Sequence, residues 1–225
     1  EALTPVIEGL RRLEYRGYDS AGIALIKNKG EALWVEKRAG KLGNLEKELG
    51  NVPKSNSGIG HTRWATHGVP SRENAHPHAS SQVCVVHNGI IENYQDLKCK
   101  LSKFGAKFIS QTDTEVLPHL IEYYYSQEGD ILRSLIKSAQ EIQGTYGVAV
   151  MFKNQPDVIA IAKKGSPIVI GLGEGEIFIA SDVSAVLSAT RKVMYLEDGD
   201  VAEIRREGVT VFGRDGKPVT RKIHL

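Results

Sequence analysis

The spacing of apolar residues along the chain switches repeatedly between a period near 3.6 and a period near 2. The helical period opens the sequence, where Pro5 is tolerated because a residue in the first turn of a helix has no intrahelical partner for its N–H. Thr112 and Glu115 have the spacing of a capping box at the start of a helix. We predict helices at 3–13, 41–49, 94–104, 113–125, 131–139 and 183–189.

The two-residue period dominates the chain after Gly144. We predict strands at 21–26, 33–38, 57–62, 82–87, 146–152, 158–162, 168–172, 176–180, 193–196, 200–205 and 209–212. The glycine-rich run 171–175 is predicted to be a hairpin turn, because a phosphate-binding loop would need a helix after it. Many antiparallel strands with paired helices, without strict alternation of strand and helix, indicate an α+β fold of stacked sheets covered by helices.

Composition narrows the class of protein. With 41% hydrophobic and 25% charged residues the chain has the average of folded proteins, and nothing marks a boundary within residues 1–225, so we expect a single domain. A net charge of +2 without a basic run indicates neither a nucleic acid nor a membrane partner, so we expect a small ligand. Two cysteines are too few for a disulfide framework and are typical of a reducing cytoplasm.

Candidate chemistry concentrates in the segment 60–68, which holds two histidines, an arginine, a tryptophan and two threonines between glycines. We interpret this segment as a binding loop, because loops on a rigid scaffold carry many binding residues. Arg63 could hold a carboxylate through two parallel hydrogen bonds, the alternative being an ordinary surface arginine. Trp64 is either a packing residue or a cover that excludes water from a bound ligand.

The pair Asn88 and Gly89 allows two interpretations. Asn-Gly after an alternating strand is the usual signal of a hairpin turn. The same turn would expose the Gly89 N–H and the Asn88 carboxamide on one side, which is what an oxyanion hole requires.

Asp113 also allows two interpretations. It is expected in the first turn of the predicted helix 113–125, where the helix dipole favours a carboxylate. It could instead bind an ammonium group. Together with Arg63 for a carboxylate, it would then form a site for a free α-amino acid.

The histidines raise a further alternative, a metal-dependent hydrolase, because five of the seven fall between residues 61 and 87. No carboxylate or cysteine recurs with them at ligand spacing. Pro77 extends the chain between His76 and His78, so these two rings need not converge. We therefore expect no metal site.

Five segments together resemble the glutaminase domain of the glutamine:fructose-6-phosphate aminotransferases, also called glucosamine-6-phosphate synthases, which are class II, N-terminal-nucleophile amidotransferases. These segments are LEYRGYDSAG at 13–22, GHTRWATHG at 60–68, VHNGIIEN at 86–93, TDTE at 112–115 and GSP at 165–167. The resemblance covers essentially the whole chain. The amidophosphoribosyltransferases and asparagine synthetases share the Arg-Gly and Asn-Gly pairs but carry different residues around them, so the segments 15–19 and 63–68 favour this family.

This resemblance implies a four-layer αββα fold, in which two antiparallel sheets lie between helix layers. It also implies that Arg63 holds the α-carboxylate of L-glutamine and that Asp113 holds its α-ammonium group. Asn88 and the N–H of Gly89 would form the oxyanion hole. No metal or cofactor is implied.

Three further parts of the site follow from the resemblance. Thr66, His67 and Gly68 would line a mobile loop that closes on glutamine. Trp64 would help to gate the passage of ammonia. The nucleophile's end of the site would be supported by Arg16 and Gly17.

The nucleophile of the family is an N-terminal cysteine, whose own α-amino group, with a pKa of about 7.7 to 8.0, can take the thiol proton. The sequence begins with Glu1, and neither this cysteine nor its short strand precedes the opening helix. Cys84 and Cys99 cannot replace it, because neither carries a free α-amine. We expect a leader before Glu1, and a polypeptide that truly began there should show almost no glutamine hydrolysis.

In the full enzymes of the family, two isomerase lobes use the ammonia to convert fructose 6-phosphate to glucosamine 6-phosphate for amino-sugar biosynthesis. Residues 214–225 would begin the connector to these lobes. The resemblance thus implies L-glutamine and the isomerase domains as partners, and a cytoplasmic, homo-oligomeric full enzyme. The alternative is a non-catalytic glutamine-binding or regulatory module.

Overall fold

The computed structural model describes residues 1–27 and 32–225. Its helices are α1 (Leu3–Leu13), α2 (Leu42–Glu46), α3 (Tyr94–Ser102), α4 (Val116–Glu128) and α5 (Ile131–Glu141), with short 3₁₀ turns η1 (Glu14–Arg16) and η3 (Val183–Ala185). Its strands are β1 (Ser20–Lys27), β2 (Ala32–Ala39), β3 (Gly58–Arg63), β4 (His78–Ala79), β5 (Val83–Ile91), β6 (Gly144–Phe152), β7 (Gln155–Lys164), β8 (Val169–Leu172), β9 (Ile177–Ala180), β10 (Val193–Tyr195), β11 (Val201–Arg205), β12 (Gly208–Phe212), β13 (Pro218–Val219) and β14 (Ile223–His224).

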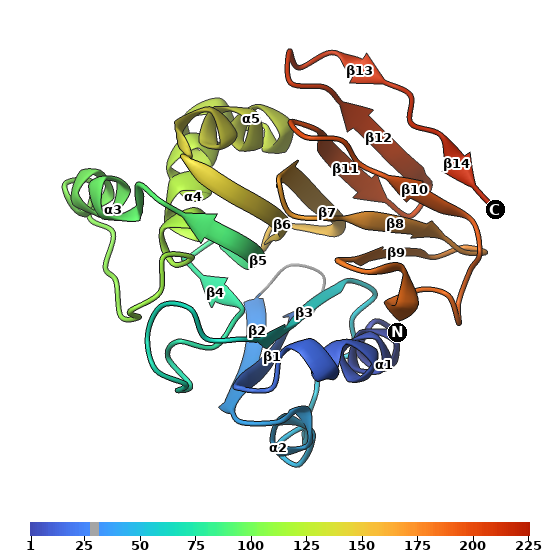
Figure 1. Ribbon diagram of the computed structural model, residues 1–225. Helices are drawn as coiled ribbons and strands as arrows, with labels where there is room; N and C mark the ends of the chain where they lie inside the picture. The colour runs from blue at the N-terminus through green and yellow to red at the C-terminus, as the bar shows by residue number, and fades with distance from the viewer. Residues whose placement is uncertain (28–31) are drawn as a thin grey trace.

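These strands form three antiparallel sheets (Figure 1). The largest has the order β13-β12-β11-β7-β6-β5-β4, a second has the order β14-β10-β8-β9, and the third has the order β2-β1-β3. The connections between neighbours in the large sheet are mostly short hairpins, as antiparallel pairing allows. The predicted α+β class with antiparallel sheets is therefore confirmed.

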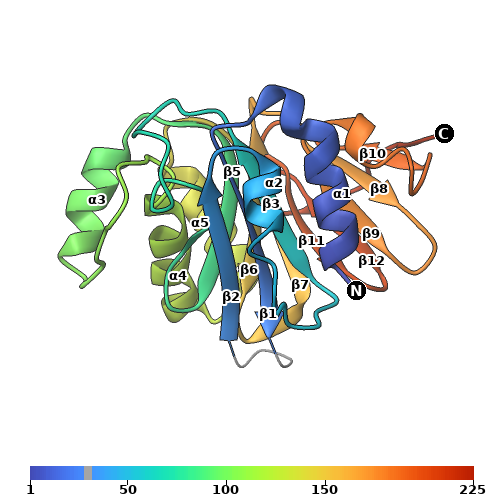
Figure 2. The same cartoon turned by 90° about the horizontal axis from the view of Figure 1, so that it is seen from below.

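Helices cover the outer faces of two sheets, as the two views in Figures 1 and 2 show. α4 and α5 pack against the seven-stranded sheet, where Leu117, Leu120 and Leu135 are fully buried. α1 and α2 pack against the three-stranded sheet, where Leu10 and Leu45 are buried. The apolar stripes predicted from the helical period therefore mark the faces that the helices bury.

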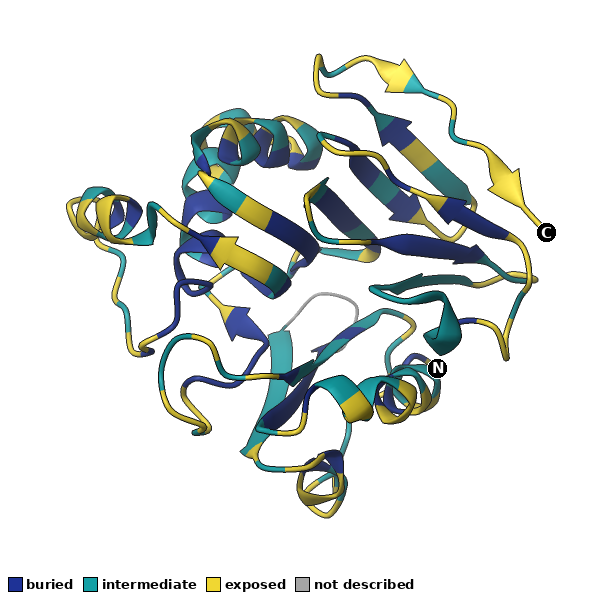
Figure 3. Cartoon of the chain, viewed as in Figure 1, coloured by how far each residue is buried: buried dark blue, intermediate teal, exposed yellow. Residues whose placement is uncertain are grey.

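β5 shows how the alternation of side chains joins these layers. Val83 and Val85 lie in the core shared with the helices, whereas Cys84 packs on the opposite face with Ala24 and Ile59 of the three-stranded sheet. β1 and most of β6 are likewise buried (Figure 3). A strand that is buried on both faces has apolar residues at consecutive positions, and the run from Val83 to Val86 has this pattern.

Most predicted elements are confirmed, although η3 replaces the longer helix predicted at 183–189. The turn predicted at 171–175 is the hairpin between β8 and β9, and the Gly173 N–H donates to the Glu176 carbonyl at 3.0 Å. Among residues 1–27 and 32–225, no helix is long and apolar enough to cross a membrane.

The predicted capping box is wrong. α4 begins at Val116 rather than at residue 113, and its N-terminus has no side-chain cap. The Glu115 carboxylate instead accepts hydrogen bonds from the N–H groups of Ile109 and Ser110, at 2.9 and 2.8 Å. Thr112 bonds to the His78 ring at 3.0 Å. The Glu115 carboxylate is thus used by the segment just before it, and Thr112 by a histidine 34 residues away, so neither side chain forms the predicted cap.

The predicted hairpin turn at Asn88 and Gly89 is also wrong, because β5 continues to Ile91. Asn88 pairs with Gly147 and Gly89 pairs with Tyr146 of β6. Gly89 has φ +131°, and a Cβ atom there would lie 2.1 Å from the Thr145 carbonyl oxygen. Glycine is therefore required for this irregular strand rather than for a turn.

Candidate functional site

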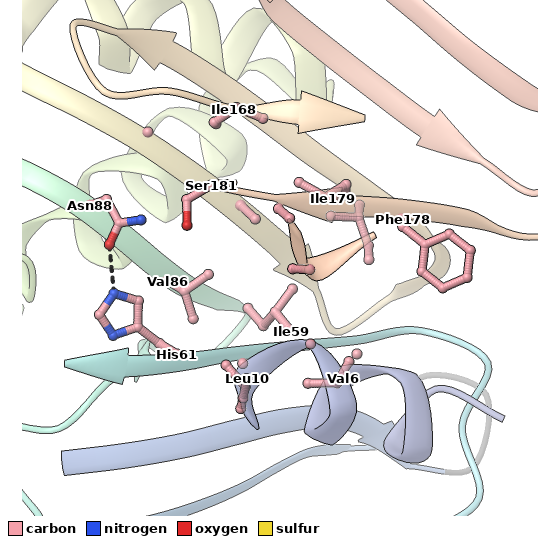
Figure 4. Close-up of a pocket in the computed structure, with 18 of the residues that line it drawn as sticks. Val6, Leu10, Ile59, His61, Val86, Asn88, Ile168, Phe178, Ile179 and Ser181 are labelled. Carbon is pink, nitrogen blue, oxygen red and sulfur yellow. Dashed lines mark hydrogen bonds between the residues drawn. The ribbon is translucent and has the colours of Figure 1, made fainter. Parts of the chain in front are cut away.

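A cavity of about 790 Å³ lies between α1, β3, β5, β6 and β9 (Figure 4). Seven of the ten residues predicted for the site line it: Arg16, Arg63, Trp64, Thr66, Asn88, Gly89 and Asp113. The other three, Gly17, His67 and Gly68, lie beside the lining residues. The sequence therefore identified a set of residues that the fold brings to one place, although they are spread from residue 16 to residue 113.

Arg63 reaches the cavity from the end of β3. The two-residue period of the strand puts Arg63 on the same face as Ile59 and His61. Its Nη2 donates to the carbonyl oxygens of His67 and Gly68, the second at 3.2 Å. Its Nη1 is buried and has no hydrogen-bond partner among the described residues. A buried guanidinium with free N–H groups can bind an anion such as a carboxylate.

Electrostatics at Arg63 favour a charged partner. Burial lowers the pKa of this guanidinium from its usual value, while the negative charges of Asp19 and Asp113 act in the opposite direction. Removing an arginine from water costs free energy, and a bound anion would offset part of that cost. Arg63 is only 4% exposed, so the surface interpretation of this residue is wrong.

Asp113 lies before α4 rather than in its first turn, so the interpretation by the helix dipole is wrong as well. Its Oδ2 accepts a hydrogen bond from the Ile91 N–H at 2.8 Å. Its Oδ1 lies 4.0 Å from Nδ1 of His67. This carboxylate is buried and lines the cavity, so its remaining acceptor positions can take an ammonium group.

The loop after Arg63 is held by a hydrogen bond at its beginning, whereas the side chain of Trp64 in the same loop is exposed. Oδ2 of Asp19 accepts a hydrogen bond from the Ala65 N–H at 2.7 Å. Trp64 is 59% exposed, and its ring meets that of Tyr18 edge to face at 5.6 Å. Trp64 is therefore not a core residue, and it lines the cavity.

Asn88 and Gly89 lie on β5, opposite β3. Asn88 is on the same face of the strand as Cys84 and Val86, which points its side chain toward the three-stranded sheet. There its Oδ1 lies 2.8 Å from Nε2 of His61 (Figure 4). This contact could not be predicted from the sequence, because no local pattern shows that these two strands face each other.

Arg16 and Gly17 connect η1 to other parts of the site. Arg16 Nη2 donates to Oγ of Ser181 at 2.6 Å, and Nη1 lies 3.7 Å from Oδ2 of Asp182. Gly17 packs so closely on β3 that a Cβ atom would lie 2.6 Å from the Thr62 carbonyl oxygen. The Arg-Gly pair thus fixes η1 against β3 on one side and against the segment after β9 on the other.

Four of the histidines gather beside the cavity. The ring of His76 lies 4.3 Å from that of His61, 5.0 Å from that of His78 and 6.5 Å from that of His87, so the rings of His76 and His78 do converge. Burial lowers the pKa of each of the four, which keeps the rings neutral. In the part of the chain that the structure describes, no group of three or more His, Cys, Asp or Glu residues could hold a metal ion.

Comparison with known proteins agrees with this site. A model of the glutamine amidotransferase domain family matches residues 61–188, which is more than half of the chain and includes most of the residues above. The chain belongs to this family. Its matched part contains Arg63, Asn88, Gly89 and Asp113.

Amidotransferases with similar sequences match the whole chain. The glutamine–fructose-6-phosphate aminotransferase (isomerizing) of Symbiobacterium thermophilum is 50% identical over 99% of the chain, and that of Pseudomonas aeruginosa is 51% identical over 98%. The chain covers 36% of the length of each of these relatives. The resemblance to this group of amidotransferases that the sequence motifs indicated is therefore confirmed.

An amidotransferase structure also matches the fold. The glutamine phosphoribosylpyrophosphate amidotransferase from B. subtilis superimposes with a TM-score of 0.78 at 28% identity, over 95% of this chain and 47% of that one. The antiparallel α+β architecture is thus that of class II amidotransferase domains.

Proposed function

We propose that the chain is the glutaminase domain of a glutamine:fructose-6-phosphate aminotransferase. It would hydrolyse L-glutamine to glutamate and ammonia, and the full enzyme would use the ammonia to form glucosamine 6-phosphate from fructose 6-phosphate. One observation carries the proposal: a single cavity brings together the buried Arg63 guanidinium, the Asp113 carboxylate and the Asn88 carboxamide. The similarity to curated aminotransferases over nearly the whole chain supports it.

Arg63 and Asp113 would recognise the two charges of a free α-amino acid. The α-carboxylate would take the Nη1 side of Arg63, which has no hydrogen-bond partner among the described residues. The α-ammonium would donate to Asp113. Thr66, His67 and Gly68 would close over the ligand. The hydrogen bonds from Arg63 Nη2 to the carbonyl oxygens of His67 and Gly68 would hold this loop next to the bound carboxylate.

The proposed reaction proceeds through a thioester. A cysteine thiolate attacks the γ-carboxamide carbon of glutamine, so that a C–S bond forms and the π electrons of the carbonyl move to its oxygen. The Asn88 carboxamide and the Gly89 N–H would donate to this oxygen, and each such donor stabilises the transition state by about 3 kcal/mol. The C–N bond then breaks, and ammonia leaves with the proton that the α-amino group took from the thiol. Water hydrolyses the thioester to glutamate and restores the thiol.

Neither cysteine within residues 1–225 suits this role. Burial raises the pKa of Cys84 to about 12, and Cys99 is exposed on α3, so neither is an activated thiol in the cavity. The cavity continues between Ile59 of β3 and Ile179 of β9, two strands that are each at the edge of a sheet (Figure 4). We propose that an extended segment of the full polypeptide pairs with these edges and carries the cysteine to the site.

The same proposal extends to the fold, to the connection with further domains and to the location of the protein. The helix layers on the seven-stranded and three-stranded sheets support the four-layer αββα arrangement of N-terminal-nucleophile hydrolases, with residues 1–225 as one domain. Residues 214–225 would lead to the isomerase domains. Two free thiols suit a cytoplasmic location, and Trp64 would gate ammonia on its way to the second site.

Assays of the full natural polypeptide test this function. Glutamate release from L-glutamine and formation of glucosamine 6-phosphate are both expected. An N88A variant should bind glutamine in calorimetry but lose about 100- to 1,000-fold in kcat. Glutamine binding without glutamate release by the unmodified polypeptide would instead indicate a binding module, and absence of binding would refute both functions.

A further inference from the structure

The contact between His61 and Asn88 joins the two sheets beside the cavity. β3 alternates so that His61 lies between Ile59 and Arg63 on one face, and Asn88 lies on the facing side of β5. His61 Nε2 and Asn88 Oδ1 are 2.8 Å apart, and the dashed line in Figure 4 marks this hydrogen bond. The amide nitrogen of Asn88 points away from His61 in the same view.

The surroundings of the ring decide where its proton lies. Nδ1 of His61 is buried and has no hydrogen-bond partner among the described residues. A proton on Nδ1 would be a buried N–H without an acceptor, and Nε2 would then face the Asn88 oxygen lone pair to lone pair. A proton on Nε2 removes both problems, because Nε2–H donates to Oδ1 and only a lone pair is left at Nδ1.

The opposite orientation of the Asn88 amide is disfavoured for the same reason. If its nitrogen donated to Nε2, the proton of a neutral His61 would be forced onto the buried Nδ1. The contact therefore fixes the amide with its oxygen toward His61. Among the described residues, no acceptor holds the Asn88 Nδ2 group, so its N–H bonds are available to a ligand in the cavity.

The histidine cluster keeps His61 in this state. Its ring packs on that of His76 at 4.3 Å with an interplanar angle of 33°, which limits rotation of the ring. Burial is the main cause that lowers the pKa of His61 to about 4; the hydrogen bond with Asn88 opposes this shift, and the positive charge of Arg63 adds to it. A neutral ring has one N–H, and the packing directs that N–H to Asn88.

We propose that His61 is a positioning residue of the glutaminase reaction, which holds the Asn88 carboxamide with its N–H toward the carbonyl oxygen that becomes negative in the transition state. This inference rests on the proposed glutaminase function and adds to it a residue that does not touch the substrate's reacting atoms. Because the oxyanion forms only in the transition state, His61 affects kcat rather than the binding of glutamine.

Two variants separate the hydrogen bond from the packing. H61F keeps a ring of similar shape and removes the donor, whereas H61Q keeps an N–H near the position of Nε2. In the full natural polypeptide, H61F should lower kcat for glutamate release by about tenfold or more with KM within about twofold, since a whole oxyanion donor is worth about 100- to 1,000-fold. H61Q should recover most of this loss. An unchanged kcat in H61F, or equal losses in both variants, would overturn the inference.

A spectroscopic measurement tests the same inference without a variant. Nitrogen-15 shifts of the His61 ring at neutral pH should show a neutral ring protonated at Nε2, and protonation at Nδ1 would overturn the inference even if H61F failed to fold. Failure of the proposed function is distinct. It would appear as the absence of glutamate release by the unmodified polypeptide, whereas failure of this inference leaves that activity intact.

Discussion

Oδ2 of Asp113 accepts a hydrogen bond from the backbone N–H of Ile91 at 2.8 Å. This bond ties the segment before α4 to the last residue of β5, close to the Asn88 and Gly89 pair. It also leaves Oδ1 of the same carboxylate for another partner. A residue that spacing alone would assign to a helix start is thereby held at the cavity by a strand.

Substitution of Asp113 by Asn should weaken glutamine binding while the fold is kept. An asparagine oxygen can still accept from the Ile91 N–H, but the charge that would hold the α-ammonium is lost. A hydrogen bond to a charged group is worth about 1.5 to 3 kcal/mol, so KM for glutamine should rise by about tenfold to a hundredfold. Steady-state kinetics of the full polypeptide checks this. The exposed D96N variant is the control, and an unchanged KM in D113N would contradict the assignment.

Substitution of Arg63 by Lys should impair ligand binding and the order of the loop together. A lysine cannot donate to the carbonyls of His67 and Gly68 and also present a second N–H edge to a carboxylate. We expect KM to rise by about tenfold or more and amide hydrogen exchange in 64–68 to become faster. R72K, at an exposed arginine later in the same connection between β3 and β4, should leave both unchanged. Normal exchange with a raised KM would show that loop order does not depend on Arg63.

Substitution of Gly89 by Ala should strongly destabilise the protein. Its φ of +131° disfavours a side chain, and the new Cβ atom would lie 2.1 Å from the Thr145 carbonyl oxygen. The backbone strain alone costs about 1 to 3 kcal/mol, and each kcal/mol lowers Tm by about 2 to 4 °C in a chain of this size. Thermal unfolding of G89A and of G43A makes the comparison, because a Cβ at Gly43 in α2 meets nothing within 4 Å. A Tm of G89A equal to that of G43A would show that β5 tolerates the change.

The buried histidines should make stability fall in mild acid. The pKa of His61 drops from 6.5 to about 4 in the folded protein, and burial shifts that of His78 in the same direction. Between these values the unfolded chain binds more protons than the folded chain. The stability contributed by each neutral ring is therefore fully present above about pH 6.5 and decreases as pH falls toward 4, by up to about 1.4 kcal/mol per pH unit.

Urea unfolding at pH 7 and pH 5 measures this loss. H78Q should show a smaller loss, because glutamine can keep the hydrogen bond to Thr112 but does not titrate. H224Q removes an exposed histidine on β14 and should behave like the unmodified protein. If H78Q and H224Q lose the same free energy of unfolding, the cluster does not carry the pH dependence.

The sequence predicted those features that depend on local spacing. The apolar stripe around Leu10 predicted α1, and alternating residues predicted most strands of the second half of the chain. Predictions failed where a distant partner decides the structure. β5 continues through Asn88 and Gly89 because β6, more than fifty residues later, pairs with it. Thr112 does not cap α4 because its hydroxyl bonds to the ring of His78, 34 residues earlier.

The candidate site shows the same division. The segment 60–68 and the pair Asn88 and Gly89 could be selected from residue types alone, and all of them lie at or beside the cavity. The contact between His61 and Asn88 could not be predicted, because it depends on which faces of two separate sheets meet. The sequence shows that these histidines lie between residues 61 and 87, but not that their rings meet around His76, since they come from β3, β4, β5 and the loop before β4.

The two sides of the Arg63 guanidinium have one further consequence. On one side, Nη2 holds carbonyl oxygens of the chain's own loop; on the other side, Nη1 is buried and has no hydrogen-bond partner among the described residues. The guanidinium of Arg63 thus contacts both the loop and the position proposed for the ligand. A compound whose carboxylate binds only at Nη1 of Arg63 would leave the contacts of Nη2 with the loop carbonyls in place. Inhibitors of this site can therefore be sorted by whether they engage Arg63 alone or also reach the loop.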